Sequence, residues 1–216
     1  MIESIKKLTF FHGLDDLEVL PLLSSARVRD YNTTEIMTYE EDDLQRVFFL
    51  LEGEAKLYKV DRYDNEVFLY TLAQNALLTN IGSLEDNSIA CFSNIEFLAE
   101  SKVISFDMTS FKTLVKSENI LLQNLVNALS LQKQMMDCTI NMGMVYDGTA
   151  KVANMLYHHT DLFNSLKKQE IAYRLNIQPA TLSRILAKMI RKGVIEEHDH
   201  KISICQKTEL YELFHN

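Results

Sequence analysis

Short apolar runs rich in β-branched and aromatic residues recur between about residues 36 and 106. The clearest are Val47–Leu51, Ala55–Val60 and Val67–Leu72. Strands of this length, separated by turn residues, predict an antiparallel roll or barrel. Several runs are apolar on both faces, so we expect those strands to be buried on both sides. The chain has only six glycines, so some tight turns must be formed by Asn and Asp.

From about Thr109 to Tyr146 the pattern is helical, with Ser117 as a candidate cap. Side chains at alternating three- and four-residue intervals form a heptad seam: Leu122, Leu125, Leu129, Gln132, Met136 and Thr139. This seam predicts a helix that pairs with its twin in a homodimer, and a long core helix within one subunit is the alternative. The helix also carries Met135, Met136, Met142, Met144 and Cys138. The methionines fit either an adaptable, effector-responsive surface or ordinary interface packing, and the cysteine is a candidate redox site.

The last third of the chain begins at a break, Asp147–Thr149, that offers two candidate N-caps. One helix is expected up to about His159, and two more over roughly 168–175 and 179–192. Two β-like runs around a polar tip, within 194–204, then predict a hairpin. Three helices followed by a hairpin describe a winged helix.

The spacing within this segment is typical of a helix-turn-helix. Apolar contacts between two short helices come from Ile171, Leu175, Leu182 and Ile185. Ala172 suits the helix crossing, Asn176 suits a left-handed turn position, and Pro179 suits the first turn of the second helix. We expect this second helix to enter the major groove of DNA, and a purely structural helical hairpin is the alternative.

At these residues the chain resembles the Crp/Fnr transcription regulators. The resemblance is tightest at Lys168–Ala172 and Pro179–Leu186. Phe10–Leu14 resembles the opening segment of the family, Val47–Tyr58 its cyclic-nucleotide-binding strand pair, and Asp147–Ala153 its hinge. The similarity extends over almost the whole chain.

The resemblance implies an α+β protein in three parts. These are an N-terminal antiparallel β-roll that acts as a sensory domain (1–108), a long dimerisation helix (109–146) and a C-terminal winged helix that binds DNA (147–216). The implied function is a homodimeric, sequence-specific transcription regulator on a near-palindromic operator of double-stranded DNA. Asp147 is the implied hinge, and RNA polymerase is a partner if the protein is an activator.

The resemblance also implies which residues contact DNA: Lys168, Gln169, Gln178, Thr181, Ser183, Arg184 and His198. Arg184 should read a guanine edge with its guanidinium. Lys168, Gln169 and Thr181 should contact phosphate, Gln178 opens the recognition helix, and His198 sits at the wing tip. The family usually has a glutamate where this chain has Ala180, so we expect a half-site that is richer in A·T at that step.

Charge is distributed unevenly along the chain. The net charge is −8, yet residues 166–192 carry seven basic side chains and one acidic one, which gives +6 there and −14 elsewhere. A compact basic segment in an acidic chain is the electrostatic signature of a nucleic-acid contact. No apolar run approaches the roughly 18 residues that span a bilayer, and three cysteines lie far apart without CxxC spacing. We therefore expect a cytoplasmic protein without a membrane partner.

The sequence argues against two effectors that relatives use, cyclic AMP and an iron–sulfur cluster. Relatives that bind cyclic AMP have a Gly-Glu pair and an Arg-Ser pair in the roll, whereas here Ser83 follows Gly82 and no arginine occurs from Glu85 through Lys102. A buried phosphate would lack a bidentate donor, so we expect no cyclic AMP. Three cysteines cannot supply the four ligands of an iron–sulfur cluster.

We predict no cofactor and no metal. His12, beside two phenylalanines, leaves haem as an alternative. His158 and His159 would point about 100° apart on a helix, and His198 with His200 lacks further ligands. An alternative function is a ligand-binding signalling adaptor that uses the winged helix for protein interaction. We expect no enzyme, because the sequence contains no Ser/His/Asp, Cys/His or phosphate-loop constellation.

Overall fold

The computed structural model describes residues 1–199 and 201–215. It divides the chain into two compact units, residues 1–136 and 137–216. Each unit has a hydrophobic core of its own.

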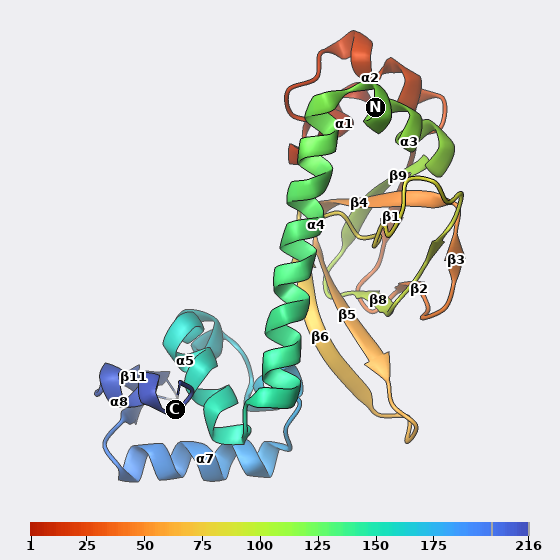
Figure 1. The fold of residues 1–216 in the computed structure, drawn as a ribbon. Coiled ribbons are helices and arrows are strands. Elements are labelled where there is room, and N and C mark those ends of the chain that lie inside the picture. The colour runs from red at the N-terminus through yellow and green to blue at the C-terminus, as the bar shows by residue number, and fades with distance from the viewer. Residues whose placement is uncertain (200, 216) are drawn as a thin grey trace. The chain divides into compact units, whose positions relative to one another are not determined.

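The first unit is built on an antiparallel β-roll. Its strands are β1 (Arg27–Tyr31), β2 (Ile36–Thr38), β3 (Asp43–Leu44), β4 (Arg46–Glu52), β5 (Glu54–Val60), β6 (Glu66–Ala73), β7 (Ile89–Ala90), β8 (Asn94–Phe97) and β9 (Ser101–Asp107). They pair in the orders β1-β9-β4, β2-β8-β5-β6 and β3-β7 (Figure 1). The three strands expected from the apolar runs are confirmed as β4, β5 and β6, and side chains on both faces of β4 and β5 are buried.

The turn between β4 and β5 requires Gly53. Its φ is +101°, and a Cβ there would lie 2.1 Å from the Ser101 hydroxyl oxygen and 2.8 Å from the Ser101 Cα. Other left-handed positions are occupied without glycine, by Thr34, Glu41, Asp64, Asn75, Asn176 and Asp199. Most of these are Asn or Asp, which confirms the expectation for turns in a glycine-poor chain.

Short helices close one end of the roll: α1 (Ile2–Lys6), α2 (Asp16–Leu23), α3 (Met108–Ser117) and a 3₁₀ turn, Thr9–Phe11. Asp15 caps α2 by accepting hydrogen bonds from two backbone amides of its first turn. The 3₁₀ turn places Phe10 and Phe11 against Phe49, with ring centroids 5.0 and 5.5 Å away. These rings are the centre of the larger apolar core of the unit.

Helix α4 (Asn119–Ile140) runs alongside the roll (Figure 1). It begins after a break at Glu118, because Ser117 ends α3 and does not cap the long helix. Leu121 and Leu125 are buried in the core of the first unit, and Gln132 is only 7% exposed. The predicted seam is therefore wrong in part, since Leu125 and Gln132 face the roll of their own chain.

Four of the apolar side chains that α4 exposes lie on one side of the helix and form a stripe that only partly overlaps the predicted seam. Leu122, Val126, Met136 and Ile140 are 36%, 61%, 37% and 51% exposed. With half-buried Leu129 they follow the alternating spacing of a heptad. We call these five residues the α4 stripe.

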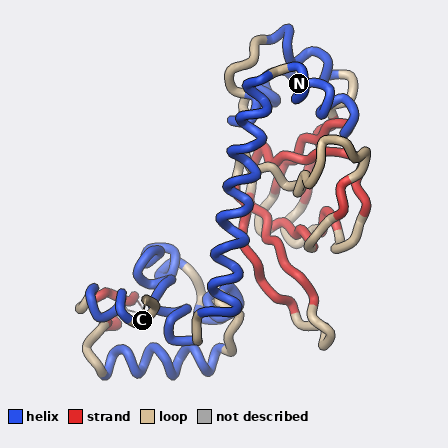
Figure 2. Tube along the Cα trace, viewed as in Figure 1, coloured by secondary structure: helices blue, strands red, loops and turns tan. Residues whose placement is uncertain are grey.

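The second unit is mostly helical with one short hairpin, as Figure 2 shows. It contains α5 (Gly148–Ser165), α6 (Lys168–Arg174), α7 (Pro179–Arg191), β10 (Ile195–His198), β11 (Lys201–Ile204) and α8 (Lys207–Glu212). The predicted order of three helices and a hairpin is confirmed. The backbone leaves helical geometry at His159, where the first helix was expected to end, but α5 continues to Ser165. In the part of the chain that the structure describes, no helix has the length and hydropathy needed to cross a membrane.

Candidate DNA-binding interface

Helices α6 and α7 form the helix-turn-helix that the spacing predicted. Asn176 has a φ of +49°, and the amide of Ile177 donates to the carbonyl of Ala172 across the turn, at 3.0 Å. Gln178 is the N-cap of α7 and Pro179 occupies its first turn. The predicted apolar contacts are buried: Ile171, Ala172, Leu175, Leu182 and Ile185 are at most 9% exposed. The steric interpretation of this segment is therefore confirmed.

Burying one face of α7 leaves a polar face open. Ala180, Ser183 and Arg184 are exposed, whereas Thr181 is half-buried. The Arg184 guanidinium donates to the Thr181 hydroxyl at 3.2 Å and to the Ala180 carbonyl at 3.4 Å. Arg184 therefore lies along its own helix and must leave these weak bonds to reach a base edge.

The candidate phosphate contacts begin at α6. Lys168 and Gln169 are both exposed, as is His198 at the end of β10. The Lys168 ammonium lies 3.5 Å from a carboxylate oxygen of Glu197 on the wing. His198 in turn lies 3.4 Å from a carboxylate oxygen of Glu196. Acidic side chains of the wing therefore lie next to two of the residues that we expect to contact DNA, Lys168 and His198.

Two further basic residues of this surface were not among the expected DNA contacts. Lys188 and Arg191 are exposed and follow Arg184 at intervals of four and three residues, which places them on the same face of α7. Both belong to the basic segment recognised from the sequence. Their helical spacing from Arg184 was the signal that could have identified them.

The first helix of this unit is capped by the residue expected to act as the hinge. The Asp147 carboxylate accepts a hydrogen bond from the amide of Ala150 at 2.8 Å, so Asp147 is the N-cap of α5 and Thr149 lies inside the helix. A π-helical turn, Asn141–Val145, precedes Asp147 in the chain, and its Met144 is 84% exposed. Asp147 therefore lies between the π turn and the capped start of α5.

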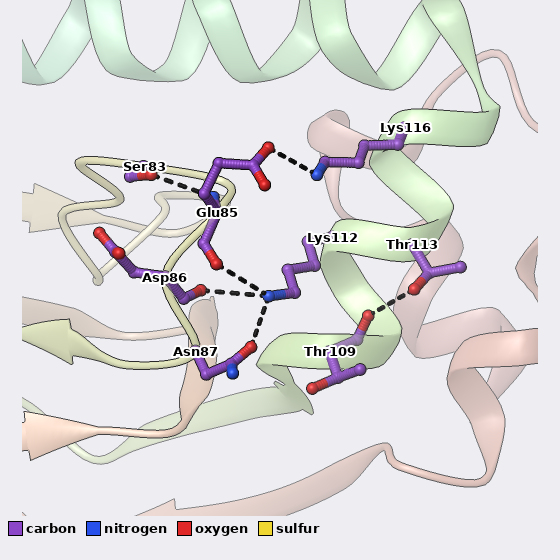
Figure 3. Close-up of polar contacts among 8 residues, drawn as sticks. All are labelled: Ser83, Glu85, Asp86, Asn87, Thr109, Lys112, Thr113 and Lys116. Atoms are coloured by element: carbon purple, nitrogen blue, oxygen red, sulfur yellow. Dashed lines mark hydrogen bonds and ion pairs between the residues drawn. The ribbon is translucent and has the colours of Figure 1, made fainter.

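In the roll, two lysines from α3 bind the loop at Glu85–Asn87, which belongs to the segment without arginine (Figure 3). The Lys112 ammonium donates to the carbonyls of Glu85 and Asp86 and to the side-chain oxygen of Asn87. Lys116 donates to the Glu85 carboxylate at 2.8 Å, and this hydrogen bond lowers the pKa of Glu85. Both ammonium groups thus bind oxygens of the loop itself, a contact that no local sequence signal predicts.

The histidines and cysteines considered for cofactors are scattered. His12 is exposed, and the neighbouring Phe10 and Phe11 are buried in the aromatic core. His158 and His159 have ring centroids 6.3 Å apart, and His200 lies outside the described residues. Within those residues no group of three potential metal ligands comes together. Cys138 is exposed and unpaired.

Comparison with known proteins agrees with this geometry. Residues 150–213 match the model of the Crp-like helix-turn-helix domain. No curated protein matches the chain by sequence comparison.

Solved structures share the fold over most of the chain. CooA from Carboxydothermus hydrogenoformans, in a variant form, is 18% identical with a TM-score of 0.69, covering 94% of this chain and 96% of its own. FixK2 from Bradyrhizobium japonicum is 13% identical with a TM-score of 0.66, covering 87% and 96%. A protein from Eubacterium rectale assigned to the Crp/Fnr regulators is 15% identical with a TM-score of 0.67, covering 98% and 100%. The second unit therefore contains a Crp-like helix-turn-helix domain, and the chain shares the fold of these solved structures.

Proposed function

We propose that this protein is a homodimeric regulator that binds a near-palindromic operator and is controlled by an effector other than cyclic AMP or an iron–sulfur cluster. The observation that carries the proposal is the exposed polar face of α7, which bears Arg184, Lys188 and Arg191 on a helix-turn-helix. A helix presented in this way fits the major groove, and the guanidinium of Arg184 can bind a guanine edge bidentately.

The α4 stripe supports the dimer. Exposed apolar residues at heptad spacing gain free energy when a second helix covers them. Replacing Val126 with glutamate places a charge in the stripe, so we expect a monomer in sedimentation analysis. Gln134 is also exposed but lies about 120° round the helix from Leu122. Gln134→Glu is the matched control and should remain dimeric; dimerisation of both variants would contradict this interface.

The operator should reflect the symmetry of the dimer. Two recognition helices would enter successive major grooves about 34 Å apart. Ala180 offers only a methyl group, which suits contact with a thymine methyl, so we propose a half-site richer in A·T at that step. A fixed G·C pair there would contradict this part of the proposal.

The proposed exclusion of cyclic AMP rests on the loop of Figure 3. Lys112 and Lys116 are the cations that approach Glu85–Asn87, and both are engaged by oxygens of this loop. A phosphate would have to displace three hydrogen bonds to reach the Lys112 ammonium and the bond to the Glu85 carboxylate to reach the Lys116 ammonium.

In vitro selection of genomic fragments by the purified protein, at two salt concentrations, tests the function. Enrichment of one inverted repeat is expected, with affinity that falls steeply as salt rises because phosphate contacts release counterions. Arg184→Ala should abolish the enrichment. A protein that retains no DNA under either condition would contradict the proposal and favour the signalling adaptor.

A further inference from the structure

The C-terminal helix α8 packs against α5 through a cluster of aromatic rings (Figure 1). Phe214, two residues after the end of α8, is only 5% exposed and lies at the centre of this cluster. Its ring centroid is 5.4 Å from that of Tyr211, 5.5 Å from that of Tyr157 and 5.8 Å from that of His158. Phe214 and the fully buried Leu210 belong to the second core, so they hold the C-terminal segment on this unit.

The cluster also contacts the residue that leads into α5. The rings of Phe214 and Tyr146 are 6.3 Å apart in an edge-to-face arrangement. The amide of Tyr146 donates to the carbonyl of Asn141 at 3.0 Å and thereby closes the π turn, and the next residue, Asp147, caps α5. The C-terminal segment therefore packs on the start of α5 and on the turn that precedes it.

His158 is the member of the cluster that can change its charge near neutral pH. Its side chain is exposed on one side, so protons reach it freely. Burial against the cluster lowers the pKa of His158, and so do three groups that are positive when protonated: His159 on α5, and His215 and Lys207 from the C-terminal segment. The Lys207 ammonium lies 5.1 Å from the ring centroid of Tyr157, within the same cluster.

No negative charge of the two helices compensates this site. Among the described residues, three acidic side chains occur on α5 and α8, and none of them is a charge that acts on His158: Asp161, Glu209 and Glu212. Protonation of His158 would therefore add a positive charge to a partly desolvated site that is already positive.

We propose that the C-terminal segment is a pH-sensitive clamp on the start of the second unit, and that protonation of His158 opens it. The neutral imidazole packs edge-to-face against Phe214 and keeps α8 on α5. The imidazolium is repelled by Lys207, so the charged form favours the detached segment. Because the attached state has the lower pKa, the clamp is fully stabilised above the ordinary histidine value of 6.5, and this stabilisation is lost as the pH falls from there towards the lowered pKa.

Opening of the clamp should affect the DNA-binding surface. Leu210 and Phe214 share the second core with Ile185 and Leu186 of α7. Detachment of α8 would therefore remove apolar contacts from the core on which the recognition helix packs. We expect acid to weaken specific DNA binding for this reason. This consequence rests on the proposed function, whereas the opening of the clamp does not.

NMR spectroscopy of the full chain tests the clamp directly. Imidazole signals followed from about pH 8 to about pH 5 should show His158 titrating below 6.5. Amide hydrogen exchange, corrected for its intrinsic pH dependence, reports on α8 through the amide of Leu210, which donates to the carbonyl of Gln206 at 3.0 Å. Its protection factor should fall at least about twofold between about pH 7.5 and about pH 5.5. The amide of Leu50, which donates to the carbonyl of Ala76 in the first unit, should change less.

Three variants separate the clamp from a general effect of acid. His158→Gln keeps a polar side chain but cannot be protonated, so the protection of Leu210 should no longer fall in acid. His12→Gln removes an exposed histidine from the first unit and is the matched control, which should respond to acid as the wild type does. Phe214→Leu retains an apolar side chain in the core but removes the ring, so the pKa of His158 should rise towards 6.5.

Three results would overturn the inference: His158 titrating at or above 6.5 in the wild type, an undiminished acid response of Leu210 in His158→Gln, or an equal acid response of Leu50 in the wild type. Operator affinity is measured separately at both pH values. It should fall more steeply in the wild type than in His158→Gln, and equal falls would overturn the link to DNA binding. A lack of specific DNA binding at either pH would count against the proposed function and would leave the exchange measurements valid.

Discussion

Glu197 on the wing should weaken DNA binding by occupying Lys168. The two charged groups are 3.5 Å apart, with side chains 28% and 54% exposed. A phosphate that approaches the ammonium of Lys168 must displace this carboxylate. Exposed ion pairs of this kind contribute about 0.2–1 kcal/mol. Glu197→Gln should therefore tighten operator binding by about 1.4- to 5-fold.

Fluorescence anisotropy with the selected operator would measure this effect at several salt concentrations. Glu196→Gln removes an equal charge from the same strand, but Glu196 interacts with Ser203 and His198 and not with Lys168. It controls for general repulsion between the wing and the phosphates. In a Lys168→Gln background, Glu197→Gln should no longer exceed this control. Equal effects of the two glutamate variants in the wild-type background would refute the reasoning.

Three further predictions concern the winged helix and the roll. Arg184→Lys, which loses the bidentate fork, should cost about 1–3 kcal/mol of discrimination at one base pair. Lys188→Ala should instead weaken binding to all DNA sequences alike and lower the slope of log affinity against log salt by about 0.9 in a salt titration. Gly53→Ala should lower the free energy of unfolding, measured in urea, by at least about 3 kcal/mol, because residue 53 has a positive φ and the new Cβ would clash with Ser101. Gly82→Ala is the control: position 82 has open space around it, so the free energy of unfolding should change by less than about 0.5 kcal/mol. Asn176→Val should destabilise the second unit by about 1–2 kcal/mol at its left-handed turn, and Asn176→Gly should be nearly neutral; equal unfolding midpoints for these two variants would contradict the role of the turn.

The helix-turn-helix was predictable because its constraints are local. Ala172, Asn176 and Pro179 each satisfy a steric requirement that depends on a few neighbouring residues. The strands of the roll were predictable for a similar reason, since short apolar runs such as Val47–Leu51 must be buried on both faces.

Contacts between distant segments were not predictable in this way. Lys112 and Lys116 reach a loop more than 20 residues earlier in the chain, and nothing in their local spacing marks that loop as the target. The buried side-chain oxygens of Asn75 and Gln132, which have no hydrogen-bond donor among the described residues, are likewise apparent only in the folded chain. The argument against cyclic AMP considered only the arginine-free segment itself, so it missed the two lysines that bind its loop from α3.

The phase of α4 shows why a heptad pattern is ambiguous when a helix has two neighbours. An apolar side chain can face either the roll of its own chain or a partner, and the sequence does not distinguish them. Leu125 was assigned to the partner although it is buried in the first unit, while Val126, one residue later, is 61% exposed. Gln132 is polar but faces inward, because the carbonyls of Leu77 and Thr79 satisfy its nitrogen. The same inward turn leaves its side-chain oxygen without a hydrogen-bond donor among the described residues, so the polar residue that breaks the expected seam is only partly satisfied in the core.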